Sequence, residues 1–132
     1  MRACLITALL SGLLIASSSS AEAGWGRLRV PGFWEAEYGG TIKNHDGYAW
    51  YRCFVKVPAG WKGGALSLSL GRIDDCDETY FNGIRIGGLG SLKPYRTASG
   101  IERRYVVSPS QVNYGDYNLI AVRVWDGGGG GA

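Results

Sequence analysis

The sequence predicts an all-β protein, built as a sandwich or a barrel of short strands. Glycine, tyrosine and tryptophan are abundant, with 22, 8 and 5 residues in a chain of 132. This composition is typical of strands joined by tight turns. Short segments of alternating apolar and polar residues are separated by Gly, Pro, Asn and Asp, and no segment predicts a helix of three turns. The length allows one domain.

The first 23 residues predict an export signal. Arg2 precedes an almost unbroken apolar run over 3–15, and Ala21-Glu22-Ala23 has the small residues of a cleavage site. The apolar run is too short to cross a bilayer. We therefore expect cleavage after Ala23, a secreted or periplasmic location without membrane attachment, and a domain over 24–132. An uncleaved anchor is the alternative.

Six segments have the alternation or the apolar content of strands. The dipeptide Asn82-Gly83 between two of them is the strongest hairpin signal in the chain, and 87–100 is expected to be a long loop. Because Trp50 and Tyr80 lie in the middle of expected strands, we expect both rings in the core. The expected strands are 48–57, 65–70, 78–81, 84–86, 103–107 and 119–124.

Four acids within five positions raise the question of catalysis: Asp74, Asp75, Asp77 and Glu78. A glycosidase needs two carboxylates that flank the scissile bond. The alternative, which we favour, is a structural polar cluster. In it the first two acids accept backbone N–H bonds at a corner, and one of the other two pairs with Arg52 or Arg123 across neighbouring strands.

Other chemistries find little support in the residues present. His45 is the only histidine, it lies in a turn, and no serine nucleophile motif accompanies it. The net charge is +3 with dispersed basic residues, which does not favour nucleic acid as a partner. We expect no cofactor. A calcium site formed by Glu35, Glu37 and Asp126 is a weaker alternative.

Two cysteines follow the expected cleavage site, Cys53 and Cys76. Export permits a disulfide between them, but two separate buried thiols are an equal alternative. The sequence leaves this choice open, because it gives no Cα separation.

The order of several short motifs resembles the sugar-binding domain of glycoside hydrolase family 2. The resemblance covers about 31–126 and implies a jelly-roll β-sandwich of the galactose-binding-domain-like type. The Asp-Asp pair and the aromatic Asn-Gly strand are most similar to the non-catalytic domain of sialate O-acetylesterase-like proteins. The motifs are Asp46-Gly47-Tyr48-Ala49-Trp50-Tyr51-Arg52, Val57-Pro58, Leu68-Ser69-Leu70-Gly71, Ile73-Asp74-Asp75, Glu78-Thr79-Tyr80-Phe81-Asn82-Gly83 and Ala121-Val122-Arg123-Val124.

The resemblance implies a non-catalytic module of a secreted carbohydrate-active enzyme. Its partners would be a glycan and a catalytic hydrolase domain, an esterase or a glycosidase, in the same or a longer chain. A stand-alone carbohydrate-binding protein is the alternative. Sugars stack on aromatic rings and bond to polar side chains beside them, although these rings are equally suited to a core or a domain contact. The candidates are Trp34, Asp46, Tyr48, Trp61, Tyr95 and Arg96.

Overall fold

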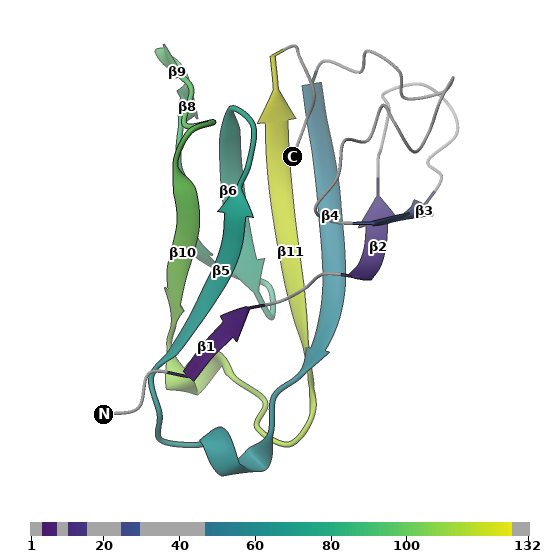
Figure 1. Ribbon diagram of the computed structural model, residues 1–132, viewed down its shortest axis with the longest axis vertical. Coiled ribbons are helices and arrows are strands. Elements are labelled where there is room, and N and C mark those ends of the chain that lie inside the picture. Colours follow the sequence, from purple (N-terminus) through teal and green to yellow (C-terminus); the bar gives the residue numbers. More distant parts are fainter. Residues whose placement is uncertain (1–3, 8–10, 16–24, 30–46, 128–132) are drawn as a thin grey trace.

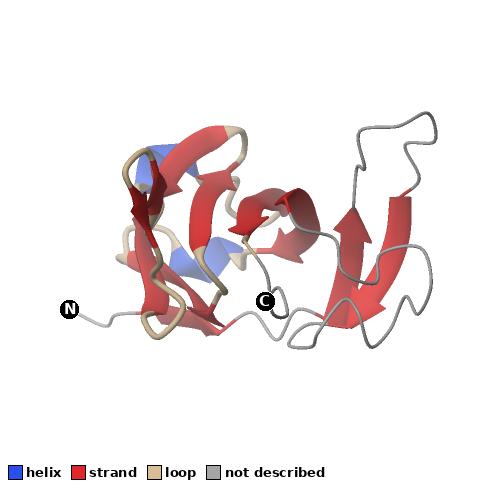
Figure 2. Ribbon diagram, turned by 90° about the horizontal axis from the view of Figure 1, so that it is seen from above, coloured by secondary structure: helices blue, strands red, loops and turns tan. Residues whose placement is uncertain are grey.

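The protein is a β-sandwich, as the sequence predicts (Figures 1 and 2). The computed structural model describes residues 4–7, 11–15, 25–29 and 47–127, with side chains from 47 onward. Its elements are β1 (Cys4–Thr7), β2 (Ser11–Ile15), β3 (Trp25–Arg29), β4 (Gly47–Lys56), η1 (Ala59–Trp61), β5 (Leu66–Arg72), β6 (Cys76–Phe81), β7 (Ile84–Gly87), β8 (Ser91–Leu92), β9 (Tyr95–Arg96), β10 (Glu102–Val107), η2 (Pro109–Gln111) and β11 (Tyr117–Asp126).

Two sheets face each other across the core. The larger sheet has the order β3-β2-β4-β11-β6-β7, and the smaller has the order β1-β5-β10. Strands β4 and β11 pair antiparallel along their whole length, from Gly47 opposite Asp126 to Lys56 opposite Tyr117. All pairs are antiparallel except β1 with β5.

The strict alternation of β4, β6, β10 and β11 decides which side chains enter the core. The alternation places Trp50 and Tyr80 on the outer face of the large sheet, so the expectation that they fill the core is wrong. Ala49 and Phe81 take the inward positions beside them. The core cluster consists of Val57, Leu66, Leu68, Ile73, Phe81, Val107, Val112, Ile120, Val122 and Val124.

The predicted hairpin at Asn82-Gly83 joins β6 to β7. Asn82 has a φ of 48° and Gly83 a φ of 82°, the left-handed conformations that a two-residue hairpin turn requires. The Asn82 side chain also donates to the side chain of Asn118 (2.8 Å) and accepts from the Leu119 amide (2.8 Å). The turn residue therefore also ties the hairpin to β11.

A small hairpin, β8–β9, lies inside the segment expected to be an unstructured loop. Ser91 pairs with Arg96 and Leu92 with Tyr95. The segment passes directly over Cys76 of β6. A Cβ at Gly90 would lie 2.6 Å from the Cys76 Sγ, and the φ of Gly90 is +81°. Only glycine therefore allows the loop to come this close to the sheet.

A buried ion pair, which the sequence did not predict, lies between the two sheets. The Arg103 Nε lies 2.8 Å from the Asp77 Oδ1, and both side chains are fully buried. The Asp77 carboxylate also accepts from the Thr79 hydroxyl (2.9 Å), the Tyr105 hydroxyl (2.8 Å) and the Leu89 amide (3.2 Å). The carboxylate thus has four donors, which offset its loss of water.

The Arg103 guanidinium uses its remaining donors on backbone carbonyls. Its Nη1 donates to the carbonyls of Ala98 and Ile101, and its Nη2 to the carbonyl of Asp75 (3.3 Å). These bonds fasten the segment that follows β9 to the corner between β5 and β6. The buried Arg103 therefore positions two loops at one end of the sandwich, the segment after β9 and the corner between β5 and β6.

Cys53 and Cys76 are free thiols, so the structure decides against the disulfide. Their strands are separated by β11, a distance of about 10 Å across the sheet. Cys53 is opposite Ile120 and Cys76 is opposite Trp125, which separates them by about 17 Å along the strands. A disulfide requires Cα atoms about 4 to 7 Å apart. Burial raises the pKa of both thiols, so neither is an activated nucleophile.

Residues expected to form the export signal pair with both sheets in the full-length chain. Strand β1 is parallel to β5, and β2 lies between β3 and β4. Both views place β2 and β3 at one side of the molecule (Figures 1 and 2). Within the described residues, no helix has the length and apolar character needed to cross a membrane. Cleavage after Ala23 remains a prediction.

We expect Arg103→Met to lower the free energy of unfolding by about 3 to 5 kcal/mol, because it leaves the Asp77 carboxylate buried without its cation. Urea unfolding of the variant and the parent measures the difference. Arg104→Met is the matched control, since Arg104 is exposed on the same strand and its loss should cost less than about 0.5 kcal/mol. Equal midpoints for the two variants would contradict the central role of the pair.

Thiol titration tests both the cysteine pairing and the export signal. The chain has 3 cysteines, and cleavage after Ala23 removes Cys4. The denatured, unreduced protein should therefore react with two equivalents of Ellman's reagent if it was exported and cleaved, and with three if it was not. The intact mass of the same sample identifies the N-terminus. A zero or single equivalent from the cleaved protein would show that a disulfide forms.

Candidate functional site

The outer face of the large sheet carries two adjacent rows of aromatic and polar side chains. The register places Tyr48, Trp125 and Cys76 in one row across β4, β11 and β6. The next row contains Trp50, Arg123 and Glu78. Side chains in such rows touch their neighbours directly. The two rows therefore form a continuous surface three strands wide.

A groove of about 110 Å³ opens on this surface at the end of the sandwich where β8 and β9 lie. This volume is several times what a single water needs. The floor comes from β6 and β11, which β4 and β7 flank on opposite sides. The segment that contains Gly90 completes the lining. The lining residues are Tyr48, Cys76, Asp77, Glu78, Arg85, Gly90, Ser91, Leu92, Arg123 and Trp125.

Arg123 links the aromatic side chains of the face to its carboxylate. Its Nη2 lies 2.6 Å from the Glu78 Oε2, which also accepts from the Tyr80 hydroxyl at 3.0 Å. The guanidinium carbon lies 4.9 Å from the centre of the Tyr48 ring and 5.8 Å from the centre of the Trp50 ring. The ion pair is about one-third exposed, so its own contribution to stability is small. The same contacts hold the guanidinium against the ring surfaces.

The aromatic rings of the face are arranged in two pairs. The rings of Tyr48 and Trp125 meet edge to face, with centres 4.9 Å apart and planes at 66°. The rings of Trp50 and Tyr80 are 5.8 Å apart and tilted by 38°. Burial and the bond to Glu78 raise the pKa of Tyr80, so its hydroxyl remains a donor at neutral pH. The face therefore combines rigid rings with fixed donors and acceptors.

Two guanidinium groups at the groove retain unused hydrogen-bonding capacity. The Arg123 Nε is buried and has no acceptor. Arg85 is exposed on β7, opposite Tyr80 in the register. Among the residues with described side chains, Arg85 forms no ion pair with a carboxylate, and only two ion pairs exist in that part of the chain. The groove thus contains a cation that the protein does not neutralise.

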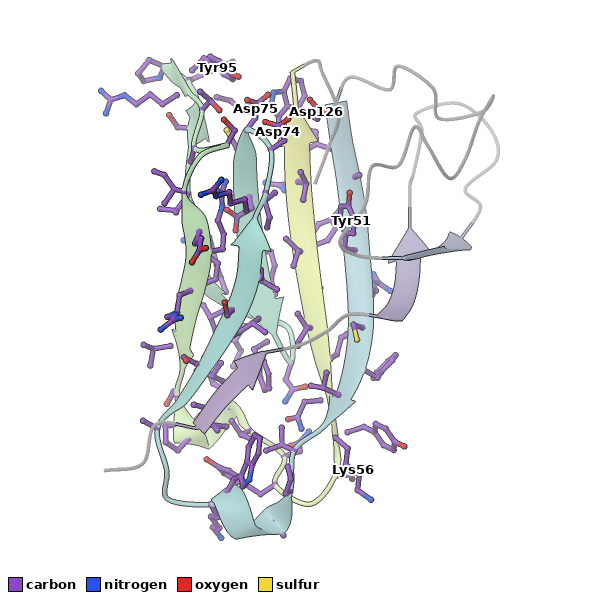
Figure 3. All side chains as sticks on the ribbon, viewed as in Figure 1. Tyr51, Lys56, Asp74, Asp75, Tyr95 and Asp126 are labelled. Atoms are coloured by element: carbon purple, nitrogen blue, oxygen red, sulfur yellow. The ribbon has the colours of Figure 1, made fainter. Side chains whose placement is uncertain are left out.

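The first two acids of the run accept backbone N–H bonds at the corner between β5 and β6. The Asp75 amide donates to the Asp74 Oδ1 (3.0 Å), and the Gly127 amide donates to the Asp75 Oδ2 (2.7 Å). Burial raises the pKa of Asp75, but bonds from Gly127, Tyr95 and Thr97 outweigh it and hold the pKa below its ordinary value. Figure 3 shows Asp74, Asp75 and Tyr95 together at this end of the sandwich.

The other two acids of the run point to opposite faces of β6. Asp77 points into the core and pairs with Arg103, which the sequence analysis did not foresee. Glu78 points outward and pairs with Arg123, one of the four pairings that the sequence left open, whereas Arg52 lies exposed on the outer face of β4. A pair of catalytic carboxylates must flank the same sugar. Since strand alternation separates these two, they cannot act together on one substrate.

The structure brings together only part of the predicted sugar-binding set. Tyr48 lines the groove and is 40% exposed. Tyr95 and Arg96 are exposed on β9 at the same end. Trp61 packs against the core from η1, which follows Lys56 at the opposite end (Figure 3). Trp34 and Asp46 lie outside the described residues.

The calcium alternative is not tested. Glu35 and Glu37 lie outside the described residues, and Asp126 is buried at the end of β11. The described part of the chain contains no group of three metal-ligating side chains.

Alternation predicts most of the groove. Arg123 alternates with Val122 and Val124, which face the core, so Arg123 and Trp125 were identifiable as outward residues of their strand. Glu78 had a weaker signal, because its inward neighbours Asp77 and Thr79 are polar. Arg85 had a weaker signal, because β7 is short and contains a register shift opposite Thr79 and Tyr80. The sequence carries no signal for the wall formed by the segment that contains Gly90, because nothing in it indicates that this loop folds back on β6.

No protein-family model matches the sequence, and no curated protein matches it. Solved structures do resemble it. The β-D-glucuronidase of Dictyoglomus thermophilum has a TM-score of 0.72 and 21% identity, over 89% of this chain and 19% of that chain. The β-glucuronidase of Ruminococcus gnavus has a TM-score of 0.67 and 17% identity, over 78% and 16%.

A glycosyl hydrolase family 2 member from Bacteroides cellulosilyticus has a TM-score of 0.67 and 19% identity, over 92% of this chain and 18% of that chain. At these identities the likeness establishes the fold, a sandwich domain found within family 2 enzymes. The chain spans less than a fifth of the length of each of these three proteins.

We expect Asp75→Asn to lower the free energy of unfolding by about 1 to 3 kcal/mol at pH 7. The pKa of the carboxyl is lowered in the folded state, so its stabilisation is present above the ordinary pKa of 3.8 and is lost as the pH falls through the folded pKa. Urea unfolding at pH 7 and at pH 3 should show the gap between parent and variant narrowing in acid. A gap of constant size would contradict the role of the ionised carboxylate.

Proposed function

We propose that this chain is a non-catalytic, carbohydrate-associated jelly-roll module that acts beside the catalytic domain of a glycoside hydrolase. The observation that carries the proposal is the fold, which matches under a fifth of three glycosidase chains. The division of Asp77 and Glu78 between two faces supports it, because it leaves the groove with one available carboxylate. The catalytic domain would belong to the same or a longer chain.

The type of catalytic partner is a finer part of the proposal. The three solved structures are glycosidases, which favours a family 2 glycosidase. The sequence motifs instead resemble the non-catalytic domain of sialate O-acetylesterase-like proteins, so a carbohydrate esterase is the other partner that we propose. The export signal that the sequence predicts over 1–23 supports a secreted or periplasmic enzyme.

A stand-alone carbohydrate-binding protein is the second candidate function. The groove favours it, since aromatic rings beside fixed polar groups are the usual surface for a sugar. Such a protein would bind a glycan without any attached catalytic domain.

The purified chain should not hydrolyse p-nitrophenyl β-glucuronide, p-nitrophenyl β-galactoside or p-nitrophenyl acetate above the buffer rate, because Asp77 and Glu78 lie on opposite faces of β6 and the described residues show no complete acid–base set. Release of nitrophenol measures this. Glu78→Gln is the control: activity that persists in the variant belongs to a contaminant. Turnover that the substitution abolishes would overturn the non-catalytic assignment.

The reading frame beyond the Ala132 codon separates the two candidate functions. Sequencing the transcript should reveal an open frame into a glycosidase or esterase domain. A stop codon at that position would contradict the module proposal and favour the stand-alone protein.

A further inference from the structure

We propose that the groove on the outer face binds an acidic sugar, a pyranose that carries a carboxylate, and that Arg85 recognises the carboxylate. This inference deepens the proposed function and rests on its carbohydrate-associated part. It assigns the ligand class to a groove that shares one residue, Tyr48, with the set predicted from the sequence.

The charges that line the groove leave an excess of one positive charge. Arg123 and Glu78 neutralise each other at 2.6 Å. Asp77 also lines the groove, but its carboxylate is neutralised by Arg103 on the core side. Arg85 remains, and no carboxylate among the described side chains pairs with it. A guanidinium offers paired donors that match a carboxylate. An anionic group on the ligand would therefore complete the site.

The rest of the groove suits a sugar ring better than a simple anion. The Tyr48 and Trp125 rings meet at 4.9 Å and offer apolar surface to the C–H groups of a pyranose. Among the described side chains, Arg123 and Tyr80 bond to Glu78, and both use its Oε2. Oε1 is thus free to accept from a sugar hydroxyl. Ring surface, acceptor and cation lie side by side along one groove.

The wall of the groove is fixed in advance of binding. The Ser91 hydroxyl donates to the Pro94 carbonyl (2.5 Å), which closes the small hairpin. The Leu89 carbonyl and amide bond to the Asp77 amide (2.9 Å) and carboxylate (3.2 Å). Such a wall loses little conformational entropy when a ligand binds. The segment therefore supports a site for a small ligand.

Calorimetric titration of the full chain with methyl β-D-glucuronide and methyl β-D-glucoside tests the proposal. The two probes differ only in the carboxylate, so we expect the glucuronide to bind at least about tenfold more tightly. Sodium acetate should not bind measurably, because it lacks the ring. The α-methyl glycoside of N-acetylneuraminic acid, as a second probe, distinguishes uronic acids from sialic acids as the source of the carboxylate.

Arg85→Gln is the decisive variant, because Arg85 is exposed and its loss should not affect folding. We expect it to weaken the glucuronide by about tenfold and to leave the glucoside unchanged. Arg104→Gln is the matched control, an exposed arginine outside the groove, and it should bind as the parent does. Circular dichroism confirms that both variants are folded.

The outcomes separate this inference from the function on which it rests. Equal affinities for glucuronide and glucoside, unaffected by Arg85→Gln, would overturn the acidic-sugar assignment and leave carbohydrate binding in place. No binding of any sugar would overturn both the acidic-sugar assignment and carbohydrate binding by this face. That second result would not affect the non-catalytic role.

Discussion

The ion pair of Asp77 and Arg103 is the interaction on which the rest of this sandwich depends. Removing two charges from water costs several kcal/mol for each ion, and the protein offsets this with a nearly complete set of hydrogen bonds. Donors from β6, β10 and the segment after β7 converge on the carboxylate, and the guanidinium returns its own donors to three backbone carbonyls. An apolar pair would fill the same space, but it would not specify where the two loops lie. We infer that the pair fixes the geometry of this end of the molecule.

Strand alternation explains why a run of acids that suggests catalysis has a structural role. Asp74 and Asp75 are at the corner, where a backbone amide fixes the turn. From Cys76 onward the chain is extended, so successive side chains must point to opposite faces. Asp77 is therefore committed to the core and Glu78 to the outer face. Four carboxylates that are close in sequence have three separate environments in the fold, and the two that share one, Asp74 and Asp75, both accept from backbone amides.

The sequence was sufficient for what depends on local pattern and insufficient for what depends on distant pairing. Alternation and the Asn82-Gly83 turn predicted the β-sandwich and the main strands, and Glu78 with Arg123 was one of four pairings that the sequence left open. Arg103 was missed, although it shares a face with Tyr105 and Val107, and a charged residue on an apolar face is a signal of a buried partner. The separation of Cys53 and Cys76 was not predictable, since it depends on β11 lying between their strands. Trp50 was assigned to the core because its position in the strand was considered without its face.

The core and the outer groove are physically coupled through the segment between β7 and β10. Gly90, Ser91 and Leu92 of this segment form a wall of the groove. On the core side, Leu89 and Ala98 are bonded to Asp77, Arg103 and Asp75. The wall is therefore held from the core side, by bonds to the buried side chains of Asp77 and Arg103 and to the backbone of Asp75. Because Asp77 and Arg103 are paired with each other, the charged side chains that remain among the described lining residues of the groove are Arg85, Arg123 and Glu78. The Asp77–Arg103 pair sets the shape of the groove, and Arg85 sets its net charge. Mutation can therefore change either property without the other.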